Sequence, residues 1–216
     1  MLSKLISKEF RLALHPTSYI FILLSSMLAI PNYPYYVIFF YTGLAIFFTC
    51  LSGRENHDVF YSMTLPVSRR DIVRARFSSA VLLEIMQLAA AIPFAILRGS
   101  YPMPGNTVGM DANAAFFGFS LLMLGIFNLT FFTMYYRDVT KVGKAFVVAS
   151  IVYFLAMLIL ETLDHILPVM SGVLDTPDPQ YIGAKLIALA AGAAAYILLT
   201  LLAYKKSVGL FIKQNL

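Results

Sequence analysis

Polar residues inside long apolar stretches are the first candidates for chemistry in this sequence. Glu84 is the only acidic residue well inside such a stretch, and Gln87, three residues on, lies on the same helical face. A carboxyl group at that depth is costly when it faces lipid, so we expect Glu84 to face protein or water. Glu84 and Gln87, together with Asn128 in a later apolar stretch, could line a polar route or a subunit interface. The alternative is structural: Glu84 could be a protonated or hydrogen-bonded packing residue, and Asn128 could form hydrogen bonds between helices.

None of the motifs typical of catalysis or metal binding occurs. The sequence has no GxxxxGKS/T phosphate-binding loop, no HExxH helix and no pair of neighbouring glutamates. His57 and Asp58 are adjacent, but no second histidine lies near them in the sequence, and no histidine lies inside a predicted membrane span. Cys50 is the single cysteine, which excludes a disulfide within the chain. We therefore expect no catalytic residue, no metal ion and no cofactor bound by this chain.

The composition indicates which solvent surrounds the protein. Of the 216 residues, 60% are hydrophobic and only 12% are charged, and the mean hydropathy is +0.79. A soluble domain carries roughly 25% charged residues, so this chain has too little polar surface to cover a globule in water. About six helices of roughly 20 residues would use most of the chain and leave no room for a second, soluble domain. The formal net charge of +5 is then better explained by membrane topology than by nucleic-acid binding.

We predict an all-α, polytopic membrane protein that forms one transmembrane domain over residues 1–216. Residues 1–15 are expected to form an amphipathic helix at the inner membrane surface, or else a plain extension of the first span. The loop at 52–76 is polar and basic. Segment 161–180 contains an apolar stretch too short to cross, so it is expected to be an extracellular, interfacial or re-entrant segment. The six predicted spans are residues 17–33, 35–51, 77–97, 114–134, 145–160 and 181–204.

The distribution of basic residues predicts the orientation. If both ends lie in the cytoplasm, all but two of the 16 Lys and Arg residues fall on the inner side, and the exceptions are Arg98 and Lys185. The opposite orientation would reverse that ratio, against the tendency of basic residues to stay inside. The same count supports the first two spans, whose apolar stretches are short, because loss of either would place the N-terminal basic residues on the wrong side.

The inner loop from Glu55 to Arg76 is expected to be ordered. Its first half has apolar residues at approximately helical spacing, and Pro66 follows them as a helix terminator. Ser68 then precedes Asp71 by three residues, which is typical of a capping box at the start of a second helix that leads into the third span. A short amphipathic helix held close to the membrane could dock a soluble partner. The apolar set consists of Val59, Phe60, Met63 and Leu65.

This loop resembles the one between the second and third spans of the permease subunits of ABC-2 type ABC transporters. Those permeases carry an acidic residue, a short amphipathic coupling helix and then an LPVSR–acid–I segment. Glu55, a helix around Asp58–Thr64 and the segment Leu65–Ile72 stand in those places here. One departure is that many members have a Gly-Thr-like pair after the acidic residue, where this chain has His-Asp-Val at residues 57–59. The six-span layout and the amphipathic N-terminal helix match as well.

The resemblance implies a permease subunit of an ATP-driven exporter in the bacterial cytoplasmic membrane. The size of the chain is similar to that of permeases that export amphipathic or antimicrobial peptides, such as phenol-soluble modulins. A separate ABC ATPase, in two copies, would bind ATP and Mg²⁺ and dock on the inner loop, and a second permease copy or a close paralogue would complete the pore. The residues that the resemblance assigns to ATPase coupling are Glu55, His57, Asp58, Val59, Phe60, Met63, Leu65, Pro66, Ser68, Arg69 and Asp71.

Two other functions stay open at the level of sequence. The inner loop could dock a protein other than an ATPase, which would make the chain a non-enzymatic membrane scaffold or assembly factor. An intramembrane protease or lipid-modifying enzyme is the other alternative. Such an enzyme requires a nucleophile with its base, or metal ligands, at matching depth in the membrane. Glu84 alone does not meet that requirement.

Overall fold

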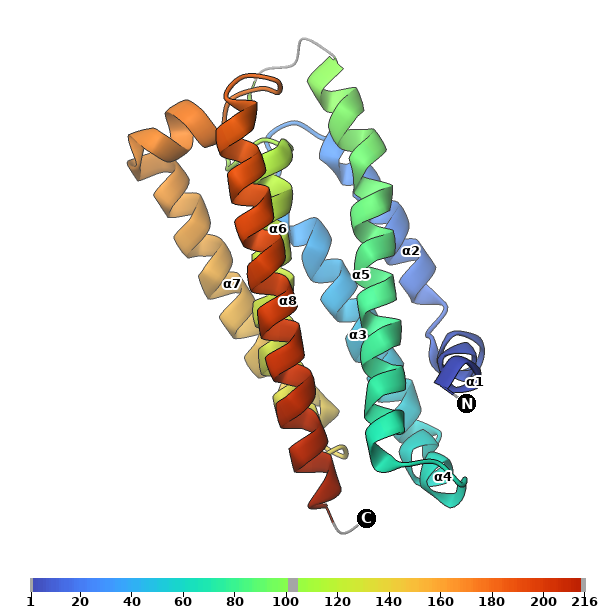
Figure 1. The fold of residues 1–216 in the computed structure, drawn as a ribbon. Coiled ribbons are helices and arrows are strands. Elements are labelled where there is room, and N and C mark those ends of the chain that lie inside the picture. The colour runs from blue at the N-terminus through green and yellow to red at the C-terminus, as the bar shows by residue number, and fades with distance from the viewer. Residues whose placement is uncertain (1, 101–104, 215–216) are drawn as a thin grey trace.

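The computed structural model describes residues 2–100 and 105–214, and the helices among them form a bundle with no β-strand in the described part of the chain (Figure 1). This confirms the all-α prediction. The elements in chain order are α1 (Leu2–Lys8), the π-helical turn η1 (Glu9–Ala13), α2 (Thr17–Leu23), the 3₁₀ helix η2 (Leu24–Ala29), α3 (Tyr36–Glu55), α4 (Asp58–Thr64), α5 (Arg69–Ser100), α6 (Ala114–Tyr135), α7 (Val142–Ile166), the π-helical turn η3 (Met170–Leu174) and α8 (Ile182–Ile212).

Five helices, α3, α5, α6, α7 and α8, are long and apolar enough to cross a membrane. Each overlaps one of the last five predicted spans. α5 begins at Arg69 rather than at Phe77, because Ser68 caps the helix well before its apolar part begins. The structure thus confirms that the helix after Ser68 continues into the third predicted span. α8 runs on to Ile212 rather than ending at Tyr204, since a helix can leave the apolar layer with its lysines exposed.

The first predicted span is shorter in the structure than in the prediction. α2 and η2 contain seven α-helical and six 3₁₀-helical residues, which reach roughly 22 Å against a hydrocarbon core of about 30 Å. The helix ends at Ala29 rather than at Tyr33, because Ile30 precedes Pro31 and adopts an extended backbone. Figure 1 shows α2 beside α5, running away from the end of the bundle that holds both chain termini, here called the terminal end. The sixth crossing stays a prediction.

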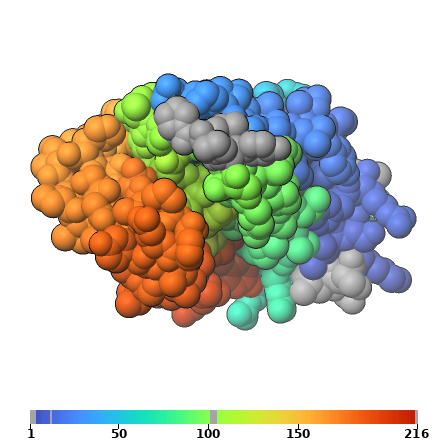
Figure 2. Space-filling model, turned by 90° about the horizontal axis from the view of Figure 1, so that it is seen from above, coloured from blue at the N-terminus to red at the C-terminus, as the bar shows by residue number. Residues whose placement is uncertain are grey.

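Two segments flank the bundle without running along it. Figure 1 shows α1 nearly end-on at the terminal end, so this helix lies across the direction of α2 and α5, as expected for a helix on a membrane surface. At the opposite end, called the loop end, α7 continues through Ile166, so the first part of the predicted loop 161–180 is helical. Only the rest of that segment, with η3, lies outside the long helices. Figure 2, which views the loop end, shows α7 and η3 on one side of the bundle and the N-terminal segments on the other.

α6 is the central helix of the bundle, and its closest neighbour is α8. Five of its aromatic side chains are buried, namely Phe116, Phe127, Phe131, Phe132 and Tyr135. The two helices approach so closely at Gly118 and Gly192 that a Cβ on Gly192 would overlap the carbonyl group of Gly118. Gly192 of α8 therefore serves packing within one subunit. Such contacts replace the hydrophobic effect, which gives no attraction between helices surrounded by lipid.

Replacement of Gly192 by alanine tests this helix contact. Because the added Cβ meets backbone atoms of α6, the two helices must separate, and we expect Gly192→Ala to lower stability by about 1–3 kcal/mol. The measurement is the thermal unfolding midpoint of the purified protein in detergent. Gly209→Ala, on the same helix with open space around the new Cβ, is the matched control and should leave the midpoint unchanged or slightly raised, because alanine favours a helix more than glycine does. Equal midpoints for the two variants would contradict the close contact.

Candidate functional site

Helix α4 lies at the terminal end of the bundle, immediately after α3 (Figure 1). Its bounds, Asp58–Thr64, confirm the helix predicted in the inner loop, and Pro66 follows it as expected. The chain turns from α3 to α4 at His57, whose backbone is left-handed with a φ of 51°. This conformation favours glycine, so a Gly-containing pair in this region of similar permeases suits the same turn. Asp58 then occupies the first turn of α4, where a negative charge is stabilised by the helix dipole.

The two faces of α4 have different environments. Val59 is buried and Met63 packs against the core, whereas Phe60 is 41% exposed. The predicted apolar set is therefore split between inside and outside. Tyr61, which the sequence pattern did not single out, is the most exposed aromatic residue of this helix at 63%. A helix of two turns is too short for spacing to decide which apolar side chains point inward, and only the packing against α3 and α5 settles it.

A group of four charged residues, here called the Arg76 cluster, fixes α4 to the bundle. The Arg76 guanidinium donates through Nη2 to Asp58 Oδ2 at 2.7 Å, and its Nε lies 2.8 Å from Glu9 Oε2. Lys8 Nζ lies 2.5 Å from Asp58 Oδ1 and donates to Ser62 Oγ at 2.8 Å. The side chains of Arg76 and Glu9 are only 5% and 3% exposed. The cluster consists of Lys8, Glu9, Asp58 and Arg76, so positive and negative charges alternate.

The Arg76 cluster joins four elements from three parts of the sequence. Lys8 ends α1, Glu9 begins η1, Asp58 begins α4 and Arg76 lies in the first third of α5. Arg76 also donates to the carbonyl oxygen of Thr49 in α3 at 3.4 Å. Breaking a buried ion pair is costly because the remaining partner is left charged and unpaired. Movement of α4 away from α5 is therefore opposed, and α4, α5 and η1 are expected to move as one unit.

A second polar group is buried between α5, α6 and α8. Glu84 Oε2 accepts a hydrogen bond of 2.5 Å from the Tyr196 hydroxyl and one of 3.2 Å from Asn128 Nδ2. Asn128 Nδ2 also lies 3.2 Å from Thr200 Oγ1. Gln87 faces a different neighbour and donates to Ser25 Oγ of η2 at 2.9 Å. The structure thus brings Glu84 and Asn128 together, whereas their partners Tyr196 and Thr200, and Ser25 beside Gln87, were missed, because no periodicity in one helix identifies its partners on another.

Burial limits what these membrane-depth residues can do in this conformation. Glu84, Gln87 and Asn128 are all fully enclosed within the subunit. A side chain that contacts a second subunit directly is exposed in the isolated one, so these three could affect such an interface only through their neighbours. Their place on a substrate route stays a prediction, which requires α5 to separate from α6 and α8. One oxygen of Glu84 and the carbonyl oxygen of Asn128 lack a hydrogen-bond partner among the described residues, so the group has unused acceptors.

The family model described as ABC-2 family transporter protein matches residues 4–212. The chain belongs to the ABC-2 transporter family. This confirms the predicted resemblance, and it supports a transport permease that passes several times through a membrane. Searches of curated proteins and of solved structures gave no match to the permease.

The N-terminus of α5 in the permease is held at two points. The Ser68 hydroxyl donates to Asp71 Oδ2 at 2.6 Å, and the Asp71 backbone N–H donates to Ser68 Oγ at 3.1 Å, which confirms the predicted capping interaction. Arg69 donates to the carbonyl oxygens of Ile212 and Gln214, at 3.0 and 2.7 Å, where α8 ends. Arg69 thus stabilises the C-terminal end of α8, and its guanidinium is engaged within the subunit rather than displayed to a partner.

Both basic residues assigned to the loop end of the permease are neutralised by acidic neighbours. Arg98 Nε donates to Asp111 Oδ1 at 2.9 Å, and the fully buried Lys185 donates to Asp178 Oδ1 at 2.8 Å. The Asp111 backbone N–H donates in turn to Asp175 at 2.6 Å, and burial raises the pKa of Asp175 to about 7. The two exceptions in the charge count are therefore local ion pairs, so they weigh little against the predicted orientation.

Removal of Arg76 tests whether the cluster holds the terminal end together. Arg76→Ala leaves Asp58 and Glu9 charged at a buried position, and we expect a loss of stability of about 3–5 kcal/mol. The thermal midpoint in detergent is the measurement, and limited proteolysis should also show faster cleavage near α4. Arg74→Ala, on the same helix but exposed, is the matched control and should cost less than about 0.5 kcal/mol. Equal losses for both variants would show that the Arg76 ion pairs contribute little.

Proposed function

We propose that the chain is the permease subunit of an ATP-driven exporter, coupled to a separate ABC ATPase that docks on α4 and the residues around it. The observation that carries this proposal is a helix with two exposed aromatic side chains, Phe60 and Tyr61, on a support that is held rigid by buried ion pairs. Exposed aromatic anchors are typical of interfaces that bind a protein partner. Membership in the ABC-2 family supports an ATPase as that partner.

The docking surface differs in part from the set that the sequence suggested. Glu55 and His57 join Phe60 and Tyr61 on the exposed side of the turn, and Pro66 is also exposed. The other candidates support this surface from within the subunit. Asp58 joins the Arg76 cluster, and the apolar residues Val59, Met63 and Leu65 are buried or half-buried against the bundle. Ser68 and Asp71 cap α5, and Arg69 binds the end of α8.

The structure supports a mechanical path from the docking surface to the membrane. A displacement of α4 acts on α5 through the Asp58–Arg76 pair, and α5 is one continuous helix from Arg69 to Ser100. Glu84 lies on that helix, bound to α6 and α8. ATP-driven movement of the partner would thus shift α5 against α8 and strain the hydrogen bonds of Glu84. We propose that the contact between α5 and α8, here called the seam, opens to the substrate when those bonds break.

The remaining parts of the proposal follow from the family resemblance and the shape of the chain. ATP and Mg²⁺ would bind to two ATPase copies, and a second permease copy or a close paralogue would form the other half of the pore in the bacterial cytoplasmic membrane. Amphipathic or antimicrobial peptides, or other hydrophobic molecules, are the proposed substrates. The segments at the loop end are short for capture of a substrate from outside, which favours export. Hydrophobic side chains exposed along α7 and α8 leave area for lipid and for the second subunit.

The docking prediction can be tested by co-purification. Phe60→Ser and Tyr61→Ser each remove an exposed aromatic anchor, so each should reduce the amount of ABC ATPase that co-purifies with the permease by roughly tenfold. The ATPase is the one encoded beside the permease, co-expressed with it. Tyr181→Ser, at an equally exposed position at the loop end, is the control and should leave the amount unchanged. A scaffold that binds another protein would give no co-purified ATPase with the unmodified chain.

The role of Glu84 in transport can be separated from its role in packing. Glu84→Gln keeps an acceptor for Tyr196 and Asn128, whereas Glu84→Leu leaves both without it, at a cost of about 0.6–2 kcal/mol per lost hydrogen bond. Transport per folded molecule, measured in vesicles with the ATPase, should survive in Glu84→Gln and fall at least tenfold in Glu84→Leu. Gly192→Ala gives the comparison for lost stability alone. If Glu84→Leu transported as well per folded molecule as Gly192→Ala, the residue would serve packing only.

A further inference from the structure

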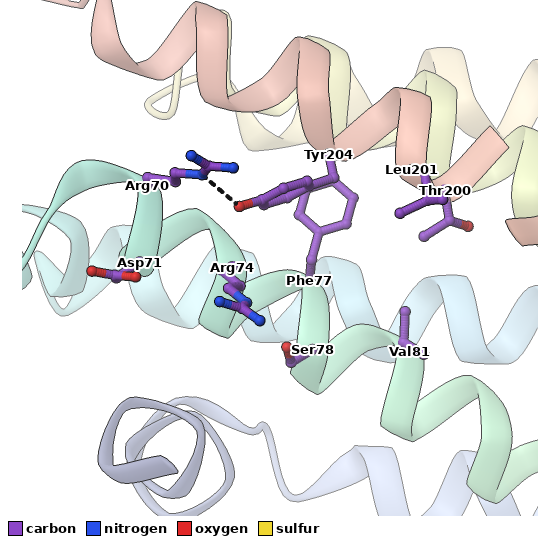
Figure 3. Close-up of a pocket in the computed structure, with 9 residues that line it drawn as sticks. All are labelled: Arg70, Asp71, Arg74, Phe77, Ser78, Val81, Thr200, Leu201 and Tyr204. Atoms are coloured by element: carbon purple, nitrogen blue, oxygen red, sulfur yellow. Dashed lines mark hydrogen bonds between the residues drawn. The ribbon is translucent and has the colours of Figure 1, made fainter. Parts of the chain in front are cut away.

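A cavity of about 490 Å³ lies between α5 and α8 at the terminal end of the bundle (Figure 3). It lies away from the exposed side of α4, and Thr200 connects it to the Glu84 group through Asn128, but the proposed function assigns it no ligand. Figure 3 shows Arg70 extended from α5 toward Tyr204 of α8, with Arg74, Phe77 and Val81 following along α5. Residues of α5 form one wall of the cavity, and residues of α8 form the other.

The lining changes from cationic to apolar along one direction. Arg70, Arg74, Phe77 and Val81 are spaced by three or four residues and form one stripe of α5. The arginines are at the terminal end, where α5 begins, and the apolar residues lie deeper along the helix toward the middle of the bundle. Leu201 of α8 lines the same cavity and is 53% exposed. The mouth of the cavity is therefore continuous with the apolar surface of α8.

The positive charge in the cavity has little compensation within the protein. Arg70 Nε donates to the uncharged Tyr204 hydroxyl at 3.4 Å, and Arg74 is exposed with no ion-pair or hydrogen-bond partner among the described residues. Asp71 is the acidic residue of the lining, but it accepts the hydrogen bond from Ser68 and lies in the first turn of α5. Two guanidinium groups one turn apart can bind a phosphate or carboxylate from two directions.

We propose that this cavity binds an anionic phospholipid, with its headgroup phosphate on Arg70 and Arg74 and an acyl chain along Phe77, Val81 and Leu201. Phospholipid is favoured because the cationic part lies at the end of a membrane-spanning helix and the apolar part continues into the membrane layer, in the order of headgroup and chain. Basic pockets between membrane helices bind anionic headgroups for this reason. The lipid would bridge α5 and α8 and so stabilise the closed seam.

The chain contains no tryptophan, which makes a single introduced tryptophan an unambiguous reporter. Leu201→Trp places it at the mouth of the cavity. The protein is reconstituted in phosphatidylcholine with a fixed fraction of brominated phosphatidylglycerol or, separately, brominated phosphatidylcholine. At Leu201→Trp, brominated phosphatidylglycerol should quench the tryptophan fluorescence more strongly than brominated phosphatidylcholine does. The corresponding binding preference should be roughly fivefold for each of the two arginines. Ile187→Trp, exposed on the same helix near the loop end, should show equal quenching by both lipids.

Three further experiments decide whether the cavity binds a phospholipid, a soluble anion or a peptide. Adding Arg70→Gln and Arg74→Gln to Leu201→Trp should abolish the preference, and since both side chains are exposed the thermal midpoint in detergent without phospholipid should stay unchanged. Inorganic phosphate should not displace the lipid, and displacement by phosphate alone would assign the site to a soluble anion. Equal quenching by the two lipids at Leu201→Trp would overturn the proposal. So would displacement of phosphatidylglycerol by an amphipathic peptide with a free C-terminal carboxylate, which would make the cavity a substrate site.

Discussion

The buried guanidinium of Arg76 is the constraint on which the terminal end of this permease depends. A charge that is shielded from water must be paired, and Arg76 finds its partners on α4 and on η1, which are separated from it and from each other in the chain. Lys8 completes the neutralisation of Asp58. The end of α1, the short helix α4 and the long helix α5 are thereby held in one geometry. A rigid connection of this kind is what transmission of force from a soluble subunit requires.

Buried polar groups also require partners inside the apolar layer, where Glu84 has a partner, Tyr196, across the seam between α5 and α8. Glu84 is bound by Tyr196 and Asn128, so α5 is attached to α6 and α8 by a few polar contacts and by the aromatic contacts of Phe77 rather than by close backbone packing. By contrast, α6 and α8 meet at Gly118 and Gly192 with no space for a side chain. Hydrogen bonds between helices can be exchanged for others when helices move, whereas tight backbone packing resists separation. The seam between α5 and α8 is therefore the place where the bundle can open with the least loss of packing.

Charge follows a consistent arrangement from one end of the bundle to the other. At the loop end each basic residue, Arg98 or Lys185, binds an aspartate, so little net positive charge remains there. At the terminal end Arg76 is neutralised internally, while Arg70 and Arg74 line the cavity between α5 and α8 without an acidic partner among the described residues. Positive charge that is not used in the fold is thus concentrated where anionic headgroups would meet the protein. The two ends of the molecule differ in electrostatics as well as in shape.

The sequence by itself determined the helical class, five of the long spans, the bounds of α4 and the cap at Ser68, because each depends on neighbours within a few residues or on local hydropathy. It did not determine the length of the first apolar helix, the exposed position of Tyr61, the role of Arg69 or the partners of Glu84. Above all, it treated Arg76 as one basic residue among many. Helical periodicity relates residues three or four apart, whereas the pairing of Glu9 with Arg76 exists only once packed helices bring distant charges into a shared environment without water.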